Sequence, residues 1–265
     1  MSNGERFIPE EHDILISLEH WHRYLHILDL VKEKDVIDIA SGTGYGTNLL
    51  AQSARNIIGF DISHEAIADA KTKYSKENLQ YLHGSVDNIP CDDHSIDVVV
   101  SFETIEHISE DMQFKFLHEV KRVLRNDGIL IISTPEKHYY SDVRNYVNEY
   151  HVKEFYENDF KIFLNKFFSH VVFNYQTTLI SSNIFNNINE RIEQKYLLNA
   201  LLETISKEYV IAYCKNEELF QIPKSSINID YENKFFNTLN VHMSELWKRV
   251  NESEKRLEES EQNNQ

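Results

Sequence analysis

The sequence predicts an α/β fold in which helices cover both faces of a doubly wound, mostly parallel, seven-stranded sheet. The first observation behind this prediction is an alternation of short apolar runs with helical segments between residues 36 and 133. The second is a glycine-rich turn, SGTGYG, that follows the first apolar run, with an acid, Asp61, at the end of the next. Parallel strands joined by right-handed helical crossovers give this order of elements.

The elements follow one another in a regular order. A helix is expected over residues 14–31, and the first five strands are expected at residues 36–40, 57–61, 79–83, 97–102 and 129–133. Helices are expected between them at residues 46–53, 64–75 and 110–124, the last ended by Asp127–Gly128. A further helix near Val152 and strands at residues 170–180 and 208–216 complete the predicted sheet.

The chain divides into four predicted parts. Residues 1–34 form an arm and a helix that can lie over a ligand, and residues 35–215 form the α/β domain. Within that domain, residues 181–207 read as a helical insert that covers the sheet. Residues 216–234 are a polar linker, and residues 235–265 are predicted to form a coiled-coil helix.

The coiled-coil prediction rests on a seam of alternating four- and three-residue steps through Leu239, Met243, Leu246, Val250, Ser253 and Leu257. Such a seam favours self-association, while a single solvated or docked helix is the alternative. Because the repeat runs almost to residue 265, we expect the natural protein to continue beyond it.

Composition narrows the classes of partner and compartment. The chain has 27 Lys and Arg against 43 Asp and Glu, for a net charge of −16, which disfavours a nucleic-acid substrate. Cys91 and Cys214 lie far apart with no metal-ligand spacing, which is typical of a reducing compartment. No run of about 18 apolar residues occurs, so we expect a cytoplasmic protein that reaches a membrane only through partners.

No metal site is predicted. The densest histidine group, His20, His22 and His26, lies in one expected helix with a spacing that does not gather three ligands on one face.

The spacing of the glycines indicates the kind of ligand. Gly42, Gly44 and Gly46 follow a G-x-G-x-G pattern, and Thr47 stands where a dinucleotide fingerprint needs its third glycine. The pattern suits a ligand without phosphate, such as S-adenosylmethionine, and Asp61 can accept hydrogen bonds from its ribose. At this point the chain resembles the Rossmann-like, class I S-adenosylmethionine-dependent methyltransferases. The resemblance continues through GSVDNIP, SIDVVVSFETIEHI and RVLRNDGILIISTP, and covers about residues 1–215.

The resemblance implies S-adenosyl-L-methionine as the cofactor and assigns residues to it. Asp61 would bind the ribose hydroxyls, Ile62 would pack on the adenine, and Phe102 would lie near the methionine end or be buried for structural reasons. The backbone of Ala40, Gly42 and Gly44 would hold the methionine part. The family often has an acid after the glycine of the third strand, where this chain has Ser85, so the adenine contact stays open among Ser85, Val86 and Asp87.

Candidate residues for the methyl acceptor come from several segments. His107, just beyond the fourth strand, is the candidate general base, with a structural histidine as the alternative. Weaker candidates for the acceptor or for a lid over it are Arg6, Phe7, Glu10, Tyr24, Glu103, Tyr139 and His151.

The arm GERFIPE, the segment EHWHRY and the segment NEYHVKEFYENDF look like a bacterial methyltransferase group associated with surface polysaccharide and O-antigen. This resemblance implies O-methylation of a sugar or glycan acceptor, at a hydroxyl or a phosphate. The alternatives are methylation of a non-carbohydrate small molecule and a non-catalytic scaffold presented by the coiled coil in a glycan-assembly complex. A nucleotide-sugar oxidoreductase is disfavoured by Thr47 and by the lack of a Tyr-x-x-x-Lys pair after the fifth strand.

Overall fold

The apolar runs form one sheet with the strand order β3-β2-β1-β4-β5-β7-β6 among the residues that the structure describes. The structure is a computed structural model, and it describes residues 14–178, 207–217 and 222–223. The first strands are β1 (Asp35–Ile39), β2 (Asn56–Asp61), β3 (Leu79–His83) and β4 (Ile96–Phe102). The last are β5 (Leu124–Pro135), β6 (His170–Gln176) and β7 (Tyr209–Lys215).

The sheet is mixed. Strands β1 to β5 pair in parallel, as the alternation of strands and helices predicts. Strand β7 runs antiparallel to both of its neighbours, β5 and β6, because it enters between them from the opposite edge. The residue at its start, Tyr209, therefore lies at the edge where the parallel strands end, opposite Pro135 of β5 and Gln176 of β6.

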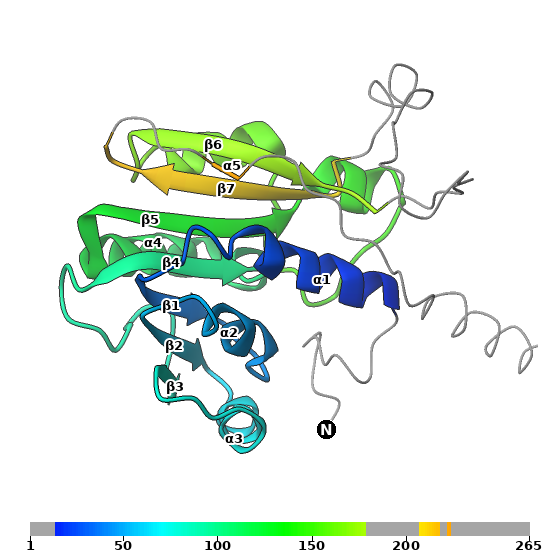
Figure 1. Cartoon of the computed structure of the whole chain (residues 1–265). Coiled ribbons are helices and arrows are strands. Elements are labelled where there is room, and N and C mark those ends of the chain that lie inside the picture. The colour runs from blue at the N-terminus through cyan, green and yellow to red at the C-terminus, as the bar shows by residue number, and fades with distance from the viewer. Residues whose placement is uncertain (1–13, 179–206, 218–221, 224–265) are drawn as a thin grey trace, which may run out of the picture.

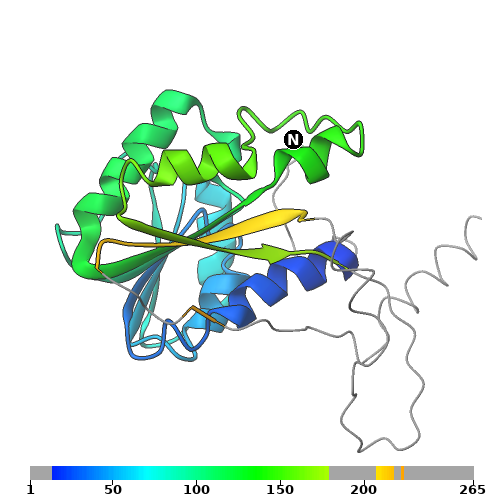
Figure 2. The same cartoon turned by 90° about the horizontal axis from the view of Figure 1, so that it is seen from above.

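Helices cover both faces of the sheet, which confirms the doubly wound prediction (Figure 1, Figure 2). One face carries α1 (Ile14–His26), α2 (Tyr45–Leu50) and α3 (His64–Lys73), and the other carries α4 (Glu110–Val123) and α5 (Glu157–Leu164). Each face has its own apolar core, because residues on successive positions of the parallel strands point to opposite sides.

Several boundaries differ from the sequence-based expectation. Helix α4 ends at Val123, since Leu124 is already extended, and Asp127–Gly128 lies inside the long strand β5 rather than ending the helix. Helix α5 begins at Glu157 instead of near Val152, and a short helical turn, η2 (His138–Asp142), precedes it. Local hydrogen bonds therefore set these ends, as they commonly do where periodicity is weak.

Some predictions fall outside the described residues. These are the arm with Arg6, Phe7 and Glu10, nearly all of the insert at residues 181–207, the linker at 216–234 apart from four residues, and the coiled coil at 235–265. Among the helices that the structure describes, none is both long enough and apolar enough to cross a bilayer.

Helix α1 packs over the start of α2 through one close approach. Tyr24 of α1 is buried, and its ring lies where a Cβ atom on Gly46 would come within 2.1 Å of the ring carbon Cζ. The same ring makes edge contacts with the rings of Tyr45 and Phe102, at centroid distances of 5.5 and 5.0 Å. Gly46 thus gives α1 room to sit against the glycine loop rather than room for a ligand.

We predict that Gly46→Ala destabilises the fold by about 1–3 kcal/mol, because the added methyl group overlaps the Tyr24 ring and forces α1 away. Thermal or urea unfolding measures the change. In a Tyr24→Ala background the same methyl group finds space, so Gly46→Ala should then cost much less. Equal costs in the two backgrounds would contradict this account of the packing.

Candidate functional site

The candidate site lies at the carboxyl ends of β1 and β4, where the strand order changes direction. Strand β1 pairs with β2 on one side and with β4 on the other, so the chain leaves β1 and β4 on opposite faces. Open parallel sheets bind ligands in the crevice that forms at such a switch point. The SGTGYG loop follows β1, and Glu103 follows β4, at this same edge.

The loop after β1 adopts a backbone conformation that favours glycine at two positions. Gly42 and Gly44 have positive φ values of 54° and 81°, which glycine adopts without steric cost. Ala40 also has a positive φ, of 58°, although it has a Cβ atom and is exposed. The strained Ala40 shows that the loop geometry is fixed by its surroundings, as is common at ligand-binding turns.

Asp61 ties the end of β2 to this loop. Its Oδ2 accepts the backbone N–H of Gly42 at 2.9 Å, and its Oδ1 accepts that of Ser63 at 2.8 Å. Each carboxylate oxygen keeps capacity for another donor, such as a ribose hydroxyl. Its neighbour Ile62 has a side chain that is 70% exposed, so an apolar surface stands uncovered beside the carboxylate.

Asp38, in β1, supports the elements on either side of the glycine loop. It was not among the predicted site residues. Its side chain is fully buried and accepts hydrogen bonds from Thr47 Oγ1 at 2.6 Å and from the Tyr24 hydroxyl at 3.3 Å. Burial raises the pKa of Asp38 to about 7, against the lowering effect of these two hydrogen bonds, and the nearby Asp61 raises it further. An acid inside the apolar strand VIDIA was the sequence signal for it.

The segment after β3 lies beside Asp61. The backbone N–H of Gly84 donates to the Asp61 carbonyl oxygen at 3.0 Å, which brings the next residues to the same edge. Ser85 and Val86 are half-buried there and Asp87 is exposed. Phe102, at the end of β4, is buried against Tyr24, so its packing role is evident. The choice of adenine contact among the three residues after Gly84 stays a prediction.

The acceptor side of the site begins at Glu103. This residue has a positive φ of 51°, and its carboxylate accepts a hydrogen bond from the Ser133 hydroxyl at the end of β5. Beyond it, the short turn η1 (Ile105–His107) carries Glu106 and His107. The structure also brings His151 here from a distant part of the chain, with its ring 5.0 Å from that of His107. Proximity of these two predicted residues is thus established, and their chemistry stays a prediction.

Two other predicted residues take different places. Tyr24 is a buried wedge between α1 and the glycine loop, and it does not lie at the surface like a lid. Tyr139, in η2, packs its ring against His138 at a centroid distance of 4.9 Å. Glu106 is fully buried beside the pair formed by His107 and His151 and was not among the predicted site residues. Its position next to His107 was the only feature of the sequence that could have indicated it.

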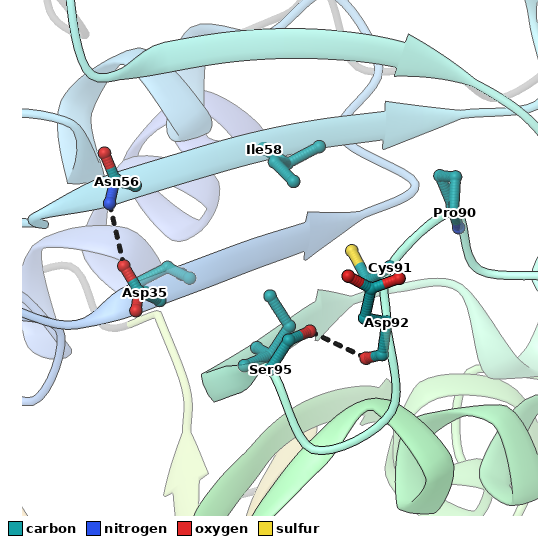
Figure 3. Close-up of a pocket in the computed structure, with 9 residues that line it drawn as sticks. Asp35, Asn56, Ile58, Pro90, Cys91, Asp92 and Ser95 are labelled. Carbon is teal, nitrogen blue, oxygen red and sulfur yellow. Dashed lines mark hydrogen bonds between the residues drawn. The ribbon is translucent and has the colours of Figure 1, made fainter.

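A separate cavity of about 310 Å³ lies at the opposite edge of the sheet (Figure 3). It is lined by the first residues of β1 and β2, Asp35 and Asn56, and by the loop around Cys91 and Ser95 that precedes β4. Because these are the amino ends of the parallel strands, this cavity is distinct from the site around Asp61.

Comparisons with known proteins indicate which family this chain is similar to. Residues 37–132 match the family described as a methyltransferase domain. A probable S-adenosylmethionine-dependent methyltransferase of Mycolicibacterium smegmatis is 34% identical over 157 residues, which are 57% of this chain and 58% of that protein. A malonyl-[acyl-carrier protein] O-methyltransferase of Pectobacterium atrosepticum is 27% identical over 112 residues, 42% of this chain and 43% of that protein. The chain thus spans about half the length of these curated relatives.

A solved structure shows the same fold. A putative S-adenosylmethionine-dependent methyltransferase from Listeria monocytogenes matches 78% of this chain and all of its own, with a TM-score of 0.54 and 19% identity. This structure shows the Rossmann-like fold, and the family match places residues 37–132 in a methyltransferase domain; S-adenosyl-L-methionine is the cofactor that this match implies.

The residues present fit that cofactor. Ser41 Oγ and Thr43 Oγ1, in the glycine loop, are buried and find no hydrogen-bond partner among the described residues. A polar ligand lying along the loop would supply partners for such atoms. The exposed side chain of Ile62 suits an aromatic base, and the carboxylate of Asp61 suits a ribose diol.

We predict that Asp38→Asn changes how stability depends on pH. The folded pKa of about 7 lies above the usual value of 3.8, so the folded state holds a proton that the unfolded state has released at intermediate pH. The wild-type free energy of unfolding should therefore fall between pH 5 and pH 8, by about 2–3 kcal/mol relative to the variant. Urea unfolding of both proteins across this range measures the difference, with the exposed Asp69→Asn as control. Parallel pH curves for wild type and Asp38→Asn would contradict it.

Proposed function

We propose that this chain, which carries a Rossmann-like, S-adenosylmethionine-dependent methyltransferase domain, transfers a methyl group to an oxygen atom of a sugar or glycan, at a hydroxyl or a phosphate. The observation that carries the transferase part is the edge formed by the glycine loop, Asp61 and the exposed Ile62, next to a polar edge after β4. The edge around the glycine loop, Asp61 and Ile62 suits the methyl donor, and the polar edge after β4 suits an acceptor.

Each part of the cofactor would contact a different group at the carboxyl ends of β1 to β4. Asp61 would hold the ribose hydroxyls, Ile62 would pack on the adenine, and one or more of Ser85, Val86 and Asp87 would lie at the adenine edge. The backbone around Ala40, Gly42 and Gly44 would face the methionine part. Phe102 would close the site on the β4 side.

Methyl transfer depends mainly on the alignment of the acceptor with the methyl donor. The cofactor supplies a methyl group on a sulfonium ion, which is already a good leaving group, so the protein has to hold an acceptor lone pair in line with it. Alignment of this kind is worth about 7–11 kcal/mol, whereas a proton-transfer group adds about 10²- to 10⁴-fold in rate. The rigid backbone around Glu103, fixed to Ser133, suits the aligning role.

An oxygen acceptor is supported by the polar groups after β4 and by a buried cation close to them. Arg23 is 1% exposed and donates from Nη1 to Gln176 Oε1 at 2.7 Å, while its Nε and Nη2 find no hydrogen-bond acceptor among the described residues. Glu103 is the first of the charges that act on it. A guanidinium with unused N–H groups at this edge favours an acceptor that carries a phosphate or carboxylate.

Two alternatives remain for the acceptor and the role. The malonyl-[acyl-carrier protein] methyltransferase relative acts on an oxygen of a non-carbohydrate group, so a small carboxylate substrate is the second candidate. A non-catalytic scaffold in a glycan-assembly complex, self-associating through residues 235–265, is the third. The proposal with the glycan acceptor has three further parts. They are a link to surface polysaccharide and O-antigen, a cytoplasmic location, and contact with a membrane through partners.

Calorimetry with S-adenosylmethionine should show binding that weakens at least about tenfold in Asp61→Ala, because charge-assisted hydrogen bonds to the ribose are lost. The exposed Asp69→Ala on α3 is the matched control and should bind like wild type. Binding of NAD in preference to S-adenosylmethionine would overturn the assignment.

Methyl transfer to an oxygen acceptor should drop about 10²- to 10⁴-fold in His107→Ala, while calorimetry shows unchanged cofactor affinity. Release of S-adenosylhomocysteine measures the rate, in a screen of nucleotide sugars, lipid-linked glycans, phosphorylated oligosaccharides and small carboxylates. The exposed His138→Ala, in η2, is the control and should keep the wild-type rate. An unchanged rate in His107→Ala would remove this residue from the mechanism.

A further inference from the structure

Three potential metal ligands converge on the acceptor side of the site. One ligand atom from each of Glu106, His107 and His151 lies within 4.8 Å of the other two. The first two come from the turn after β4 and the third from the loop before α5, 44 residues further along the chain. We propose that these three side chains bind one divalent first-row transition-metal ion, such as Zn²⁺ or Mn²⁺.

The imidazole of His107 is held in a ligand-ready tautomer. Its Nδ1 lies 3.1 Å from the carbonyl oxygen of Tyr150, which can only accept, so Nδ1 carries the proton. Nε2 then carries a lone pair, and it lies 4.0 Å from Glu106 Oε1. The ring therefore directs a metal-binding nitrogen toward the carboxylate.

The imidazole of His151 is oriented by a carboxylate, an arrangement common behind metal-bound histidines. Its Nδ1 donates to Glu154 Oε1 at 2.6 Å, and Glu154 is held in turn by the Ser141 hydroxyl at 2.8 Å. Nε2 accepts a hydrogen bond from the Asn148 amide at 3.1 Å, which assigns it the lone pair. An ion would take the place of that amide hydrogen, so Asn148 would rotate aside on binding.

The carboxylate of Glu106 completes the set from a fixed position. It is fully buried, and its Oε2 accepts from the Thr134 hydroxyl at 3.1 Å. Its backbone carbonyl accepts the N–H groups of Val152 and Lys153 at 2.8 and 3.0 Å, which fastens the turn carrying Glu106 to the loop carrying His151. A buried carboxylate close to two imidazoles is well compensated by a bound cation.

The chemistry of the donor set selects the ion. Two imidazole nitrogens and one carboxylate oxygen favour Zn²⁺, Mn²⁺ or Co²⁺ over Ca²⁺ and Mg²⁺, which prefer oxygen ligands. Ligands on one tetrahedral ion lie roughly 3.4 Å apart, so the ligand atoms have to approach one another by up to about 1.4 Å when the ion binds. Three protein ligands leave coordination positions open, and an acceptor oxygen can occupy one; this role rests on the proposed function, with His107 then acting on the acceptor through the ion and not as a proton acceptor.

Equilibrium dialysis of the whole chain against Mn²⁺ or Zn²⁺ alone, followed by metal analysis, tests the site without any substrate. We expect about one ion per chain in wild type, and a Co²⁺-loaded protein should show the absorption of a nitrogen- and oxygen-ligated ion. The thermal midpoint should rise with metal concentration, because the folded state binds the ion more strongly than the unfolded chain.

Variants separate the site from surface binding. Glu106→Gln, which keeps the shape of the side chain, and His151→Ala should each lose the ion, and Glu154→Gln should weaken it by about 10- to 100-fold. The exposed His118→Ala on α4 is the matched control and should keep the wild-type affinity. Circular dichroism confirms the fold of each variant before dialysis.

Wild type that binds no ion, or Glu106→Gln and His151→Ala that bind it like wild type, would overturn the proposal and leave a hydrogen-bonded structural cluster. Asp61→Ala distinguishes this result from failure of the proposed function. That variant should lose S-adenosylmethionine binding and retain the ion, since Asp61 lies after β2 and is not among the three ligands.

Discussion

A single buried carboxylate organises the donor half of this site. Asp38 lies in the interior of β1 and accepts hydrogen bonds from Tyr24 of α1 and Thr47 of α2, so three elements meet on one side chain. The glycine loop passes directly between β1 and α2 and takes its geometry from both. The positive φ values of Gly42 and Gly44, and the strain accepted at Ala40, follow from this anchoring.

Close packing reinforces the same arrangement from the other side. The hydroxyl of Tyr81, on β3, donates to the carbonyl oxygen of Gly44 at 2.9 Å, and its ring fills the space where Cβ atoms on Gly44 and Gly59 would stand. The hydrogen bonds of Asp38 to the elements on either side of the loop and the ring of Tyr81 thus hold the loop in place. A preorganised loop loses little freedom when a ligand arrives, which favours binding.

The sequence predicted the parts of the structure that local patterns control. The strands β1 to β5, the glycine loop and the place of Asp61 follow from apolar runs, glycine spacing and one acid at a strand end. The cluster of Glu106, His107 and His151 could not be predicted, because it forms only when the loop before α5 folds back onto the turn after β4. The acceptor is harder still to predict. The family match covers the residues around the predicted donor site, and this chain spans little more than half the length of the Mycolicibacterium smegmatis relative.

The contacts of α1 cross almost the whole described sequence. Arg23 binds Gln176, and Glu19 accepts a hydrogen bond from Thr178, partners more than 150 residues away. On the ribosome, this first helix therefore emerges long before β6 and β7 exist to receive it. Its packing against α2 can form early, whereas its hydrogen bonds to Gln176 and Thr178 form only after β6 is synthesised. The wall of the site nearest the N-terminus is thereby the last one to be completed as the nascent chain folds.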